Sequence, residues 1–161
     1  MLNLNTKPMN TNTQHKKLRI VLLLFIGLLL GLKSNAQNQS DFWLSFEKCT
    51  EASAFQSHYL PIASGTTRLH TVMNHGVSMP TMNGVTFSSN NTFEVLDKSA
   101  INASHKTNFF LIHDAKVTAS DAKFEVLYHY NYNGSYDSFV EATITLSKTN
   151  GNWTISEIVA K

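Results

Sequence analysis

Apolar and polar residues alternate along four segments between residues 107 and 161, and this is the strongest pattern in the chain. A period of two is that of side chains along a half-buried β-strand. Ser120-Asp121, Asn133-Gly134 and Asn150-Gly151 separate the segments, and such pairs form turns between neighbouring strands. The pattern therefore predicts an antiparallel meander of four strands. The residues predicted to share one face of each strand are Phe109, Leu111, His113, Ala115 and Val117; Phe124, Val126, Tyr128, Tyr130 and Tyr132; Val140, Ala142, Ile144 and Leu146; and Trp153, Ile155, Glu157 and Val159.

A different period marks the segment from Ser40 to about Ser57. Phe42, Phe46 and Cys49 recur at the spacing of one helical face, and neither Gly nor Pro interrupts the segment. Ser40 is of the residue type that caps helix N-termini. The spacing predicts one amphipathic helix that begins after Ser40.

The residues between about Tyr59 and Lys106 are rich in Ser, Thr, Asn and Gly and carry only short apolar segments. These segments, Arg68 to Met73, Val85 to Phe87 and Thr92 to Leu96, predict short strands joined by long loops. The Asn83-Gly84 pair is typical of a tight turn, which would make Val85 the start of the second strand of a small hairpin.

A helix with one apolar face and a sheet with one apolar face bury their surfaces by packing against each other. The expected fold class is α+β, with the N-terminal helix packed on a curved antiparallel sheet of four or more strands. An exposed apolar sheet face would instead expose a protein to edge-to-edge aggregation.

The stretch from Phe109 to Val159 resembles the closing strands of NTF2-like and cystatin-like α+β domains. The resemblance rests on Thr143-Ile144-Thr145-Leu146 and on Asn150-Gly151-Asn152-Trp153-Thr154-Ile155. It implies that the last two strands form a long hairpin and that Trp153 and Ile155 fill the concave face of the sheet. NTF2-like domains usually open with two or three helices, whereas this sequence offers one, which is closer to the cystatin-like arrangement.

Residues 1–36 have the composition of a secretory signal peptide. Lys16, Lys17 and Arg19 precede an apolar run from Ile20 to Leu32, and Ser34-Asn35-Ala36 places small residues at the −3 and −1 positions of a cleavage site. The run is shorter than the roughly 20 residues that span a bilayer. We therefore predict two parts, a signal peptide over 1–36 and a single α+β domain over 37–161.

Cleavage after Ala36 changes the charge of the protein. It removes five of the thirteen Lys and Arg residues and none of the eleven Asp and Glu residues, so the net charge changes from +2 to −3. A protein of this size and charge is neither a large multidomain enzyme nor a generally basic nucleic-acid binder. The sequence predicts an exported, soluble protein of the periplasm or the extracellular space, with no membrane contact after cleavage.

The single cysteine, Cys49, cannot form an internal disulfide, so the fold depends on its core. Its place among Phe42 and Phe46 favours a buried packing thiol over a reactive one. No nucleophile motif or phosphate-binding glycine loop is present, and the six histidines after the signal peptide do not have metal-ligand spacing. No cofactor and no metal are therefore predicted.

The candidate catalytic residues are His113 and Glu157, because each has apolar neighbours on its predicted face. An ionisable group on such a face is costly unless it is paired or lines a cavity. A satisfied core histidine and a solvated strand-end glutamate are the structural alternatives. This pair would serve as acid and base in an NTF2-like enzyme.

The candidate ligand-binding residues are aromatic: Tyr128, Tyr132, Tyr136 and Trp153. A tyrosine offers a large contact area with a polar tip, which suits a binding face, although alternate aromatic residues also pave a core. The sequence favours non-catalytic binding of an unidentified ligand or protein partner, with the NTF2-like enzyme as the alternative. It leaves the oligomeric state open.

Overall fold

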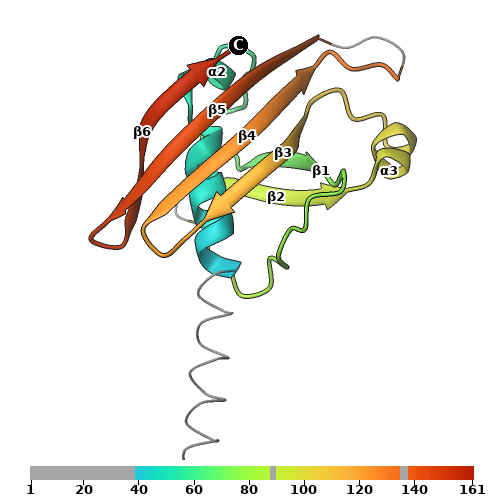
Figure 1. Cartoon of the computed structure of the whole chain (residues 1–161). Helices are drawn as coiled ribbons and strands as arrows, with labels where there is room; N and C mark the ends of the chain where they lie inside the picture. The colour runs from blue at the N-terminus through green and yellow to red at the C-terminus, as the bar shows by residue number, and fades with distance from the viewer. Residues whose placement is uncertain (1–38, 88–89, 135–137) are drawn as a thin grey trace, which may run out of the picture. The chain divides into compact units, whose positions relative to one another are not determined.

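The computed structural model describes residues 39–87, 90–134 and 138–161 (Figure 1). These residues belong to the second of two compact units, which spans Gln37–Lys161. The predicted signal peptide and the candidate residue Tyr136 lie outside the described residues. Among the residues described, no helix is long and apolar enough to cross a membrane.

The first described element is a helix over residues 39–50, here called the core helix. Trp43, Phe46 and Cys49 are fully buried, which confirms the predicted apolar face and the buried position of the thiol. The prediction of Ser40 as N-cap is wrong, because residue 39 is already helical. The helix also ends earlier than predicted: Ala52 is extended (φ −59°, ψ 135°), and the short helix α2, Ser53–Gln56, follows it.

Six strands form one open sheet in the order β2-β1-β3-β4-β5-β6. The bounds of the strands are β1 Arg68–Met73, β2 Asn91–Leu96, β3 Phe109–Val117, β4 Asp121–Tyr130, β5 Ser138–Thr149 and β6 Asn152–Ala160. The strands β3 to β6 pair antiparallel, which confirms the predicted meander. By contrast, β1 runs parallel to both of its neighbours, β2 and β3.

The connections between the first strands differ from the prediction. Residues 85–87 are not a strand, although Asn83 and Gly84 do form a turn, closed by a bond from Val85 N–H to Met82 O (3.1 Å). The segment instead packs apolar side chains on the core, and the Trp43 indole donates to the Pro80 carbonyl (2.9 Å). A short helix, α3 (Lys98–Ala103), leads from β2 toward β3, and Asp97 caps it.

The core lies between the core helix and one face of the sheet, across which the helix runs in Figure 1. Phe46 is at its centre and makes ring contacts with Phe93, Phe110 and Phe124 at centroid distances of 5.9, 5.7 and 5.4 Å. Burying aromatic side chains of this size is among the largest contributions to the stability of a small domain. The helix and the sheet therefore stabilise each other, as α+β packing requires.

Two β-bulges interrupt the regular alternation. The β3–β4 register shifts between Ile112 and Asp114, so His113 is the extra residue on β3. The β5–β6 register shifts between Thr145 and Leu146, where Ser156 is the extra residue on β6. Because of the inserted residue, each side chain after the bulge points to the opposite face of the sheet from the one that regular alternation predicts.

The β5–β6 hairpin turns through Asn150 and Gly151, whose φ angles are 52° and 83°. Two positive φ angles are the signature of a type I′ turn, and the predicted chain reversal at this pair is confirmed. We expect Gly151→Ala to destabilise the protein by about 1 kcal/mol, because an L-residue at this φ is strained and no atom of the described residues lies within 4 Å of the added methyl group. Urea unfolding measures the loss. Asn150→Gly is the control and should cost almost nothing; an unchanged Gly151→Ala midpoint would contradict the expectation.

Candidate ligand-binding site

The structure does not bring the predicted catalytic pair together. His113 is exposed at the bulge of β3, and Glu157 is exposed on β6, with β4 and β5 between the two strands. The prediction that both occupy a buried face is wrong, because a bulge precedes or includes each residue. Glu157 lies opposite Thr145, on the face of β5 that points away from the core helix.

The tyrosines have three different environments. Tyr128 is only 5% exposed and contacts Phe110 (4.6 Å) in the core. Tyr130 is half-buried and stacks on His58 (4.3 Å). Tyr132 does not continue this face, contrary to the prediction, because Asn131 has a φ of 57° and redirects the chain. Its ring packs on Phe109, and its hydroxyl donates to Asn102 Oδ1 (2.9 Å).

Trp153 is a core residue, 8% exposed, and Ile155 packs against the same core. Both therefore lie on the buried face, as the sequence predicts. The Lys148 ammonium group lies 5.5 Å from the centroid of the indole ring. Trp153 nevertheless lines a cavity of about 460 Å³ together with residues of the core helix and of the β5–β6 turn. It does not line the cavity described next.

A cavity with several polar side chains in its lining lies at the place where β1 and β3 diverge. β1 pairs with β2 over six residues, but with β3 only at Val72 and Met73. The remainder of β1 and the chain leading into β3 therefore diverge. The space between them, here called the split cavity, has a volume of about 320 Å³ and is lined by residues 67–71 and 105–110 together with Leu60, Ile62 and Tyr128.

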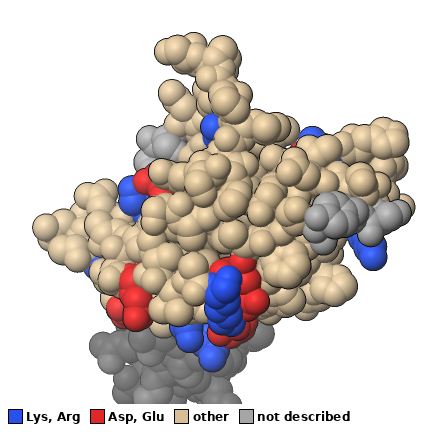
Figure 2. Space-filling model, turned by 90° about the horizontal axis from the view of Figure 1, so that it is seen from above, with Lys and Arg blue, Asp and Glu red and all other residues tan. Residues whose placement is uncertain are grey.

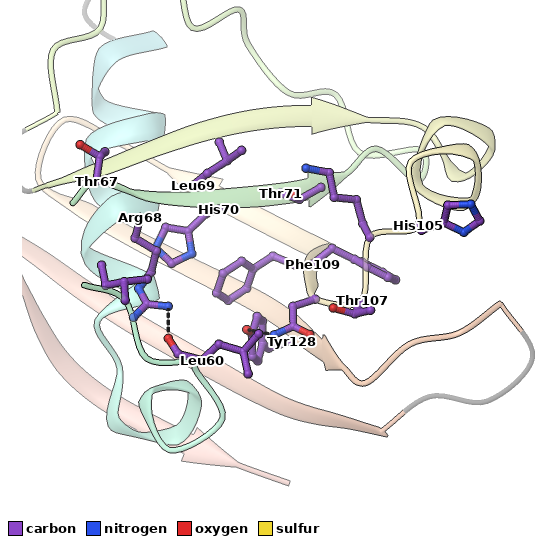
Figure 3. Close-up of a pocket in the computed structure, with 14 residues that line it drawn as sticks. Leu60, Thr67, Arg68, Leu69, His70, Thr71, His105, Thr107, Phe109 and Tyr128 are labelled. Atoms are coloured by element: carbon purple, nitrogen blue, oxygen red, sulfur yellow. Dashed lines mark hydrogen bonds between the residues drawn. The ribbon is translucent and has the colours of Figure 1, made fainter. Parts of the chain in front are cut away.

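The side chains of His70 and Tyr128 approach the split cavity from β1 and β4, with Arg68 and Leu60 at one end (Figure 3). His70 is 5% exposed and stacks on Phe93 at 5.2 Å. Desolvation lowers the pKa of His70 to about 4 and outweighs the opposing effect of the Asn91 side chain, whose Oδ1 lies 3.3 Å from Nε2. The imidazole is therefore neutral at pH 7, able to donate or accept a hydrogen bond but not to act as a cation.

Arg68 is fixed at the entrance to the cavity by two contacts. Its guanidinium group lies 4.8 Å from the centroid of the Tyr59 ring and donates to the Leu60 carbonyl (3.0 Å). The Tyr59 hydroxyl donates to the Thr50 carbonyl at the end of the core helix (2.5 Å), and burial raises the pKa of Tyr59. Tyr59, which is hydrogen-bonded to the end of the core helix, therefore orients Arg68.

Three further polar contacts involve residues of the walls. Asn108 Nδ2 donates to the Tyr128 hydroxyl (3.3 Å), and burial raises the pKa of Tyr128. Glu94 accepts from Thr71 and Lys106, both at 2.6 Å. Partial desolvation raises the pKa of Glu94, but these two bonds outweigh it and lower the pKa overall. Glu94 is thus ionised and holds Lys106 near the cavity.

Arg68 and His70 are the residues that the sequence-based search for a site missed. The only sequence signal was their place on one face of the predicted strand from Arg68 to Met73, together with Val72. That pattern does not reveal which strand lies beside β1, and the cavity exists because β3 pairs with only part of β1.

The described residues that line the split cavity include no Asp, Glu, Ser or Cys. Over the described part of the chain, no group of three or more His, Cys, Asp and Glu residues could hold a metal ion. The face visible in Figure 2 carries its acidic and basic side chains in small mixed groups. The cavity therefore offers hydrogen-bonding groups, apolar contact, the guanidinium charge of Arg68 and the ammonium group of Lys106, which is paired with Glu94.

No protein-family model, curated protein or solved structure matches the chain.

Proposed function

We propose that the protein is an exported, non-catalytic binding domain of NTF2-like or cystatin-like architecture that holds a small ligand in the split cavity. The observation that carries the proposal is the composition of this cavity: hydrogen-bonding groups and apolar side chains surround about 320 Å³, with no Asp, Glu, Ser or Cys among the lining residues described. Pockets of this size and mixed character are typical of small-molecule sites.

The architecture supports the proposal in a second way. The inner wall of the cavity belongs to strands that the core helix covers: His70, Phe110 and Tyr128 are all at most 5% exposed. The outer wall includes exposed residues outside the strands, such as Thr67, His105 and Thr107. A site built on rigid strands loses little entropy when a ligand binds. The acid-base pair of His113 and Glu157 gives no support to the enzyme alternative, because the two residues lie on separate strands and face solvent.

Native mass spectrometry of the full chain, purified under non-denaturing conditions, tests the proposal. We expect the wild-type protein to carry a bound ligand mass and the Thr107→Trp variant to lose it. Thr107 is exposed and lines the cavity, so an indole ring at this position would occupy the space of the ligand. Thr149→Trp is the matched control, because Thr149 is exposed at the far end of β5. The absence of a bound mass on the wild-type protein would contradict the proposal. So would a bound mass that Thr107→Trp retains to the same extent as the wild-type protein.

A further inference from the structure

The charged side chains that line the split cavity are basic. Arg68 and Lys106 belong to the lining, and Lys106 is paired with Glu94. Arg68 has no carboxylate partner among the described residues; its contacts are the Tyr59 ring and the Leu60 carbonyl. The Arg68 charge acts electrostatically on His70 and Tyr128. The Glu47 carboxylate acts on His70 in the opposite direction. Arg68 therefore brings a positive charge to the cavity that no carboxylate among the described lining residues pairs with.

The main chain of β1 adds hydrogen-bond donors. The Arg68 N–H donates to Asn90 O (2.8 Å), so the even-numbered residues of β1 direct their main-chain groups toward β2. Because these groups alternate in direction along a strand, those of Leu69 and Thr71 point toward β3. β3 does not pair with either residue. The N–H groups of Leu69 and Thr71 are consequently directed toward the split cavity, and so is the carbonyl group of Leu69.

The rim of the cavity is apolar. Leu60 is 61% exposed and Ile62 is 46% exposed. Both belong to the lining, together with the buried ring of Phe110. At about 30 Å³ for each water molecule, a volume of about 320 Å³ corresponds to a ligand of about ten non-hydrogen atoms. Such a ligand would be anionic at one end and apolar at the other.

We propose that the split cavity binds a carboxylate that ends a short apolar group, with the carboxylate on Arg68 and the main-chain N–H groups of β1, and the apolar part against Leu60 and Ile62. A guanidinium group forms two parallel hydrogen bonds with a carboxylate, which makes it the preferred partner for this anion. The inference rests on the proposed function and specifies the ligand class of the same site. The carboxylate could belong to a free small molecule or to the C-terminus of a peptide.

Titration of the full chain with benzoate and with benzamide, followed by ¹H-¹⁵N NMR, tests the ligand class. The two compounds have nearly the same shape and differ in charge. We expect benzoate to bind at least tenfold more tightly than benzamide and to shift the amide signals of Leu69 and Thr71. We also expect Arg68→Gln to weaken benzoate binding at least tenfold. Lys116→Gln is the control, since the side chain of Lys116 is 79% exposed at the far end of β3.

The comparison of the two compounds on the wild-type protein does not depend on how Arg68→Gln folds. Equal binding of benzoate and benzamide, or no binding of benzoate, would overturn the inference. The proposed function would still stand if native mass spectrometry found a neutral ligand that Thr107→Trp loses. An N-acetylated Leu-Phe dipeptide with a free C-terminus, compared with its amide, distinguishes a peptide terminus from a free acid: tighter binding than benzoate indicates the peptide.

Discussion

Replacing Lys148 with Met should lower the free energy of unfolding by about 3 kcal/mol. The ammonium group of Lys148 is paired with Asp41, whose side chain is only 3% exposed in the core helix. Asp41 Oδ2 is buried with no hydrogen-bond partner among the described residues, so Lys148 is the main compensation for this charge. Removing the lysine leaves a buried carboxylate without its cation, which costs far more than an exposed pair does. Urea unfolding at pH 7 measures the change.

Two further variants identify the cause of this loss. The double variant Asp41→Leu, Lys148→Met should regain most of the stability, because a buried ion pair and apolar residues of similar volume are often equally stable. Lys116→Met, which removes an exposed lysine, should change the stability by less than about 0.5 kcal/mol. A loss below about 1 kcal/mol in Lys148→Met would place the pair with ordinary surface ion pairs.

The second large effect is a fall in the free energy of unfolding at acidic pH, which we expect because His70 is buried. Its pKa is about 4 in the folded protein and 6.5 when the group is solvated. Between these values the unfolded chain binds one more proton than the folded chain, so stability falls as the pH is lowered from 6.5 to 4. One proton over this interval amounts to about 3 kcal/mol. Below pH 4 both states are protonated, and the contribution of His70 no longer changes.

Urea unfolding at pH 7, 5.5 and 4 measures this effect by comparison with His70→Gln. The glutamine keeps a hydrogen-bond donor toward Asn91 but does not titrate. We expect the wild-type protein to lose about 3 kcal/mol more than the variant between pH 7 and pH 4. His75→Gln, at an exposed loop position, should follow the wild-type curve. Parallel curves for the wild type and His70→Gln would show that His70 is not held neutral by burial.

The elements that the sequence predicts well are those whose pattern is local. The strand Arg68–Met73 has the predicted bounds, and the four strands of the meander follow from alternation and turn pairs. The core helix is predicted by the spacing of Phe42, Phe46 and Cys49. The end of the core helix at residue 50 is not predicted by this spacing. The helix is followed by Ala52 in an extended conformation and by a tertiary hydrogen bond from Tyr59 to Thr50, neither of which leaves a local pattern.

The features that escape prediction depend on partners distant in the chain. Neither His113 nor Ser156 is of a residue type that marks a bulge, yet each reverses the faces of its strand. The parallel pairing of β1 with β2 and β3 has no counterpart in the alternation of a single strand. Since the split cavity arises from this pairing, the candidate site could not be found from the pattern of residues alone.

The bulge at Ser156 also bears on how the molecule avoids association with other chains. β6 is an edge strand of nine residues, and an edge of this length offers unpaired main-chain groups to any extended segment. The bulge bends and twists the strand in its middle, and Glu157 places a charge directly after it. The same irregularity that moves Glu157 out of the core therefore makes the edge a poor template for intermolecular β-pairing.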